Sequence, residues 1–218
     1  MSPNLRRLGA VLVAVVALSH VASSTAPAAQ FTTEKYPTTF EPTGNEGTGA
    51  FTTEAGTSRC KKITTSATLS GASSTVTVNA AFAECSATLF GTATKTAVAM
   101  NGCYYTLHVT EGSGDKYKGS GDLVCPTEKE VFGTAFISGV PVCEIHIPEQ
   151  AGAVQVELTD NTTNKTVEGK LTSSKVHYTV TLDSGACPFN GTGTKTDGKL
   201  EQSQPAVVGG KEKPAVID

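Results

Sequence analysis

Six cysteines are the residues whose chemistry the sequence constrains most: Cys60, Cys85, Cys103, Cys125, Cys143 and Cys187. A structural zinc site needs clustered ligands, typically two cysteines separated by two to four residues. The closest cysteines of this chain are 18 positions apart, and an even number of thiols in an exported chain favours oxidation. The spacing therefore predicts three disulfides, with no metal ion and no cofactor.

Six cysteines permit 15 connectivities, and the order of the strands favours one of them. Strands consecutive in sequence are usually neighbours in space, so consecutive cysteines most often come within bonding distance. We therefore predict the pairs Cys60–Cys85, Cys103–Cys125 and Cys143–Cys187. In the chain-entropy description each pair stabilises the fold by roughly 3 to 4 kcal/mol.

The histidines and carboxylates form no catalytic pattern. Three histidines are out of phase with the apolar residues of their strands, which predicts solvated positions: His108, His146 and His177. Paired carboxylates that hydrolyse glycosides leave no motif. Four acidic residues are candidates for that role but are expected to be solubilising: Glu111, Asp115, Glu144 and Glu157.

Other catalytic and binding motifs are missing, so we predict no catalytic residue and leave the binding residues unassigned. The chain lacks the Gly-x-Ser-x-Gly turn of serine hydrolases, and residues 71–74 are predicted to form an ordinary turn. Residues 160–164 lack the aspartates of a dedicated calcium loop. Gly169-Lys170 lacks the earlier glycine of a phosphate-binding loop.

The N-terminus has the three parts of an export signal. Arg6 and Arg7 precede an apolar run at residues 8–18, and the small residues 26–28 fit a cleavage site. The apolar run has about half of the roughly 20 residues that a membrane-spanning helix needs. This length favours cleavage after Ala29 over a retained anchor, and it predicts a secreted, extracellular protein.

After cleavage, 15 Lys and Arg oppose 20 Asp and Glu, giving a formal charge of −5. The charges are scattered singly and form no basic block, which argues against nucleic acid or anionic lipid as partners. We expect a monomer with no integral membrane association, whose partner is an unidentified cell-surface or extracellular ligand.

Period-two alternation recurs along the mature chain, and the full sequence contains 33 Thr and 22 Gly. Val76, Val78 and Ala80 alternate with polar residues, as do the apolar residues of 154–158 and 176–182. Alternation predicts strands with one solvated face, and glycines predict turns. The pattern predicts an all-β fold, an antiparallel β-sandwich of about ten short strands with under about 10% helix. Two smaller stacked β units are the alternative.

No linker rich in Pro, Gly or Ser divides the chain. We therefore expect a signal peptide (1–29), a single domain (30–208) and a disordered polar tail (209–218). Within the domain the sequence Phe-Thr-Thr-Glu occurs at 31–34 and again at 51–54. Both copies are expected to form edge strands.

Asn101-Gly102 predicts a type I′ turn, because both central residues of that turn need positive φ. The hairpin that it closes would have these facing pairs: Met100 and Cys103, Val98 and Tyr105, Thr96 and Leu107, Lys95 and His108. Tyr105 and Leu107 are then buried and His108 is exposed, since a slip of one residue would move the apolar set into water. Further turns are expected at 160–164, 183–185 and 197–198.

Four short motifs occur in a fixed order: residues 100–105 (MNGCYY), Cys125-Pro126, residues 143–147 (CEIHI) and residues 187–193 (CPFNGTG). Together they resemble a group of uncharacterised secreted proteins of actinobacteria, over roughly residues 31–204. The resemblance implies a bacterial exported β-protein, and it assigns no catalytic or binding residue.

These observations favour a non-enzymatic extracellular protein that acts as a structural or binding module. A secreted inhibitor or ligand carrier is the first alternative, which an apolar cavity or a rigid loop bracketed by a disulfide would favour. A secreted hydrolase is the second, which a cleft with two acids about 5 to 9.5 Å apart would favour.

Overall fold

The computed structural model describes residues 29–42, 47–54, 56–89, 92–161, 166–185, 187, 191–208 and 215–217. The predicted signal peptide, apart from Ala29, lies outside the described residues. In chain order the strands are β1 (Gln30–Thr32), β2 (Thr38–Pro42), β3 (Gly47–Thr53), β4 (Gly56–Leu69), β5 (Thr75–Leu89), β6 (Thr92–Ala99), β7 (Tyr104–Ser113), β8 (Lys116–Val124), β9 (Val131–Ile137), β10 (Val140–Ile147), β11 (Gln150–Asn161), β12 (Thr166–Asp183), β13 (Gly193–Val208) and β14 (Ala215–Ile217). The all-β, antiparallel prediction is confirmed. The described part of the chain holds no apolar helix of the length that a bilayer crossing requires.

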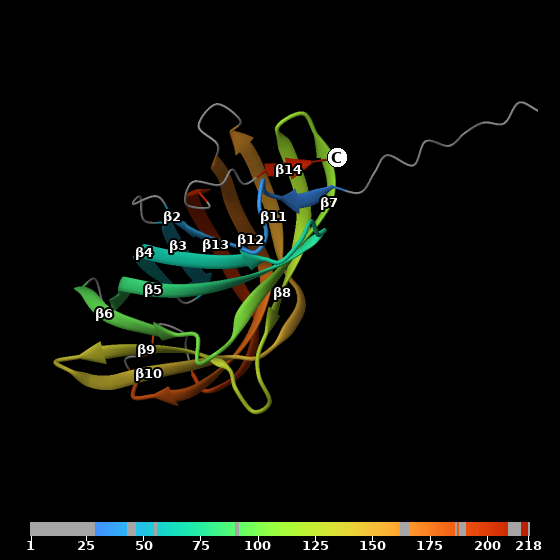
Figure 1. Ribbon diagram of the computed structural model, residues 1–218. Helices are drawn as coiled ribbons and strands as arrows, with labels where there is room; N and C mark the ends of the chain where they lie inside the picture. Colours follow the sequence, from blue (N-terminus) through green and yellow to red (C-terminus); the bar gives the residue numbers. More distant parts are fainter. Residues whose placement is uncertain are drawn as a thin grey trace, which may run out of the picture.

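The sandwich prediction is wrong, because one sheet of twelve strands closes on itself into an eight-stranded barrel (Figure 1). Four long strands, β4, β5, β12 and β13, make closure possible, and each of them changes partner along one edge; β4 and β13 pair with β2 and with β3 at different positions. Residues 75–78 of β5 pair with β7, and residues 85–89 pair with β6. Residues 166–172 of β12 pair with β11, and residues 179–183 pair with β10. Alternation along each strand cannot distinguish this arrangement from two packed sheets.

Two rings of eight strands therefore share the same long strands. The upper ring runs β4-β5-β7-β8-β11-β12-β13-β2, and the lower ring runs β4-β5-β6-β9-β10-β12-β13-β3. β2 and β3 both fill the gap between β13 and β4, one in each ring. In Figure 1, β9 and β10 lie at the bottom, while β14 lies at the top.

β1 and β14 form a separate two-stranded sheet. Phe31 of β1 also exchanges two backbone hydrogen bonds with Ser73, the N–H of each donating to the carbonyl of the other (2.8 and 3.1 Å). Part of the segment expected to be a disordered tail therefore forms a strand. Of the two Phe-Thr-Thr-Glu copies, only the first lies at an edge, because β3 is enclosed between β4 and β13.

The three predicted disulfides are present: Cys60–Cys85, Cys103–Cys125 and Cys143–Cys187. Cys60 and Cys85 face each other across β4 and β5. Cys103 and Cys125 flank the first pair of residues in the β7–β8 ladder. The third bond joins β10 to the segment after β12, its partner strand. It therefore spans a pairing of strands that are distant in sequence.

The Asn101-Gly102 turn forms, but the hairpin predicted around it does not. Asn101 and Gly102 have φ of 51° and 86°, and the Cys103 N–H donates to the Met100 carbonyl at 2.7 Å. β6 pairs with β5 and β9, whereas β7 pairs with β5 and β8, so the predicted facing pairs are wrong. Both strands pair with the same edge of β5, β7 near the beginning of β5 and β6 near its end.

The other sequence-based predictions for this region have mixed outcomes. Tyr105 and Leu107 are buried as predicted, and the side chain of His108 is 37% exposed. The β11–β12 hairpin and the end of β12 at Asp183 are confirmed. The turn at 197–198 is wrong, since β13 continues through it. There the Asp197 carboxylate accepts hydrogen bonds from the Tyr178 hydroxyl (3.0 Å) and the Glu54 N–H (2.9 Å).

Gly102→Ala should lower the free energy of unfolding by about 1 kcal/mol, because its φ of 86° disfavours a residue with a Cβ. Gly71→Ala is the matched control, since nothing lies within 4 Å of a Cβ there and its φ is not in the left-handed region. Urea denaturation followed by circular dichroism measures both. Equal effects of the two substitutions would contradict the assignment of the turn.

Candidate functional site in the barrel interior

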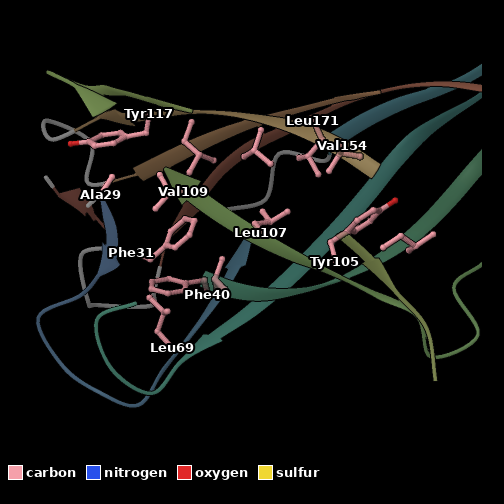
Figure 2. Packing of buried hydrophobic residues seen from close by; sticks show 14 of the residues in the cluster. Ala29, Phe31, Phe40, Leu69, Tyr105, Leu107, Val109, Tyr117, Val154 and Leu171 are labelled. Atoms are coloured by element: carbon pink, nitrogen blue, oxygen red, sulfur yellow. The ribbon is translucent and has the colours of Figure 1, made fainter. Parts of the chain in front are cut away.

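The interior of the upper ring is lined by apolar side chains that leave a cavity of about 100 Å³. Tyr105 and Leu107 of β7 line it, and Val109 of the same strand packs in the surrounding core. Each of the three is no more than 7% exposed. Figure 2 shows these side chains pointing to the same side of β7. The cavity wall takes residues from seven of the eight strands of this ring. The cavity is therefore a property of the closed barrel and not of any single loop.

The lower ring encloses a second apolar cavity of about 90 Å³, between β3, β4, β6, β9 and β10. Val98, Ile145 and Leu200 are among its apolar lining residues. Tyr105 lines both cavities. Its ring therefore lies where the two cavities approach each other.

One end of the upper cavity is closed by aromatic side chains from β1 and β2. Phe31 is 9% exposed and Phe40 is 5% exposed, and both line the cavity. In Figure 2 they lie together at the end of the cluster that is away from Tyr105. The backbone bonds between Phe31 and Ser73 hold β1 in this position.

Gln202 is the most deeply buried of the polar side chains that line the upper cavity, which also include Thr32, Thr65 and Ser66. It is 2% exposed, it lines the cavity from β13, and its Oε1 has no hydrogen-bond partner in the described part of the chain. Its neighbours Glu201 and Ser203 are exposed. Sequence reasoning missed Gln202, although its phase with Leu200 along β13 indicates the inward position.

Tyr105 adds a buried phenolic hydroxyl group to this interior. Burial raises the pKa of its hydroxyl to about 12, with no carboxylate contributing. The hydroxyl therefore stays protonated at neutral pH, when it can both donate and accept a hydrogen bond.

The three histidines lie outside the barrel and do not meet. His146 is held between two carboxylates, Nδ1 to Glu130 Oε2 and Nε2 to Glu144 Oε1, both at 2.9 Å. Its ring packs on Phe132, with centroids 4.4 Å apart. His177 is exposed. Within the described ranges no group of three or more His, Cys, Asp or Glu is placed to hold a metal ion.

His108 has the partners of a catalytic triad but not its surroundings. Nδ1 lies 3.1 Å from Thr75 Oγ1, and Nε2 lies 3.0 Å from Asp122 Oδ2. Hydrogen bonds from the Gly152 N–H and from His108 hold the pKa of Asp122 below its usual value. A triad also needs N–H donors for an oxyanion. The Thr75 N–H already donates a hydrogen bond to Ser73 Oγ. The cluster is therefore better described as a set of hydrogen bonds that links β5, β7, β8 and β11.

The other candidate acids are spread over the surface. Glu111, Asp115 and Glu157 are exposed. Glu144 bonds to His146 and also accepts from Thr181 Oγ1 at 3.2 Å. These positions give the acids solvent or neighbouring side chains as partners.

Comparison of the chain with family models, curated proteins and solved structures gave no match. The chemistry of the site is therefore argued from its own residues.

Alkaline solution should destabilise the fold, because burial raises the pKa of Tyr105 and of Tyr178 to about 12. A raised tyrosine pKa contributes stability that is present below the unfolded value of about 10 and is lost as the pH rises toward 12. Between pH 9 and pH 11 the free energy of unfolding of Tyr105→Phe should fall by roughly 1 kcal/mol less than that of the unmodified protein. Urea unfolding at the two pH values measures this.

Tyr104→Phe is the control for this experiment, because Tyr104 precedes Tyr105 on β7 and is only partly buried. Its decline with pH should match that of the unmodified protein. A Tyr105→Phe variant with the same decline as Tyr104→Phe would contradict the burial argument.

Proposed function

We propose that the protein is a secreted, non-enzymatic carrier that binds a small apolar molecule inside its barrel. The observation that supports this is the apolar cavity of about 100 Å³ in the upper ring. It favours the ligand carrier over a purely structural module, because a structural module has no need for an unfilled interior. The outward positions of the candidate acids give no support to a hydrolase.

The size of the cavities sets the size of the ligand. Protein interiors are normally packed as densely as organic crystals. An apolar cavity of about 150 Å³ remains dry and binds benzene. The two cavities here, about 100 and 90 Å³, are of the same order. We therefore infer a ligand with a body the size of one hydrocarbon ring.

The gain on binding comes from contacts that the empty cavity lacks. Atoms that line a void lose their dispersion partners on one side, and an apolar ligand also leaves water. The closed sheet and the cross-strand disulfide Cys60–Cys85 hold the walls in place before the ligand arrives. A preformed pocket avoids the free-energy cost of ordering loops on binding.

An extracellular setting is consistent with this role. The three disulfides are compatible with an oxidising compartment. An apolar molecule is poorly soluble outside the cell, so a carrier would keep it in solution.

The proposal predicts that toluene binds to the folded protein and that filling the cavity abolishes binding. Ala67 lines the upper cavity from β4, so Ala67→Leu places three additional carbons in it. Ala81→Leu is the matched control, because Ala81 is exposed on β5. Calorimetric titration with toluene, supported by methyl shifts in NMR spectra, measures the affinity.

We expect saturable binding to the unmodified protein and to Ala81→Leu, and at least a tenfold loss in Ala67→Leu. Circular dichroism checks that each variant is folded, and Ala67→Val is a smaller filling substitution if Ala67→Leu does not fold. Absence of saturable toluene binding to the unmodified protein, or equal binding to the filled and control variants, would overturn the proposal.

A further inference from the structure

The geometry points to a ligand that bears a hydroxyl group: its apolar body fills the upper cavity, and its hydroxyl group hydrogen-bonds the Gln202 amide. This inference rests on the proposed function and names the chemical class of its ligand. It is carried by the cavity together with Gln202, a lining residue whose buried amide oxygen has no partner in the described part of the chain.

The buried position of Gln202 lowers the stability of the fold. The side chain is 2% exposed, and its Oε1 has no partner in the described part of the chain. A buried polar group without a hydrogen bond destabilises a protein, and an apolar side chain of similar size would avoid that cost. A partner supplied by the ligand accounts for a glutamine at this position.

The lining of the cavity selects a neutral polar group. None of the side chains that line the upper cavity is charged. A carboxylate or ammonium group would lose its hydration there without an opposite charge to compensate. A hydroxyl group is neutral, and it both donates and accepts, so it can pair with either the oxygen or the nitrogen of the amide.

The topology also gives the ligand an orientation. Gln202 pairs with Gly49 of β3, a strand of the lower ring, and its neighbour in phase, Leu200, lines the lower cavity. Gln202 therefore lies at the floor of the upper cavity. Tyr105 lines both cavities and comes from β7, four positions from β13 around the eight-stranded ring. The two polar groups thus come from opposite walls at the floor.

The opposite end of the cavity is mainly apolar. Phe31 and Phe40 close it (Figure 2). The hydroxyl group of the ligand is accordingly placed at the floor, toward Gln202 and Tyr105, and the hydrocarbon body extends toward the two phenylalanines.

The test compares three probes of nearly equal size: phenol, which carries a hydroxyl group, and toluene and fluorobenzene, which do not. Each is titrated calorimetrically into the unmodified protein, Gln202→Leu and the control Ser203→Ala, whose side chain is exposed on the outer face of β13. Gln202→Leu should weaken phenol binding about fivefold to tenfold relative to toluene. Ser203→Ala should leave this ratio unchanged.

One comparison within this test uses the unmodified protein alone and so does not depend on the folding of a variant. There the binding free energy of phenol should be more favourable than its free energy of transfer from water into hydrocarbon predicts. Toluene and fluorobenzene should show no such excess. Tyr105→Phe should reduce this excess for phenol alone.

The outcomes separate the two proposals. If toluene binds, but phenol shows no excess in the unmodified protein and Gln202→Leu changes both affinities equally, the hydroxyl inference is overturned and the carrier stands. If toluene does not bind to the unmodified protein, the carrier itself is overturned.

Discussion

The structure depends on the requirement that both edges of every long strand find hydrogen-bond partners. β5 and β12 are 15 and 18 residues long, and no single neighbour spans either of them on one edge. Each therefore pairs with one strand in its first half and another in its second. Because unpaired backbone groups are costly when buried, this division determines where the wall splits into an upper and a lower half.

The point at which β12 changes partner shows how the requirement is met. Neither the β11 ladder nor the β10 ladder reaches His177. The Gln150 side chain takes the place of a strand there: its Nε2 donates to the His177 carbonyl at 2.9 Å, and its Oε1 accepts from the His177 N–H at 2.8 Å. One side-chain amide thus satisfies the backbone donor and acceptor of His177, where the wall divides.

Closure also separates the two kinds of polar chemistry in this protein. Outside the barrel, His108 bonds to Thr75 and Asp122 of the neighbouring strands β5 and β8, and His146 bonds to Glu144 of its own strand and to Glu130 just before β9, so the ring nitrogens of both histidines are satisfied. Inside, small residues in the walls such as Ala67 and Gly169 leave space along the axis. Elsewhere that space is filled: a Cβ on Gly121 would come within 3 Å of both Val154 and Leu107. The cavity is therefore confined to part of the interior, beside Gln202.

The sequence by itself determined the local features. Alternation identified the strands and the buried phase of Tyr105 and Leu107, Asn101-Gly102 specified its turn, and the order of the cysteines gave the three disulfides. Each of these depends on neighbouring residues or on strands that are close in sequence. The actinobacterial resemblance stays a prediction.

Only the tertiary structure decided which strands meet. A period of two states which face of a strand is buried but not which strand lies beside it, so β6 and β7 diverge after a perfect hairpin turn, and β10 pairs with β12. Closure of the sheet follows from these distant pairings. Closure in turn makes the interior position of Gln202 an enclosed one, because the walls opposite it come from strands far away in the sequence.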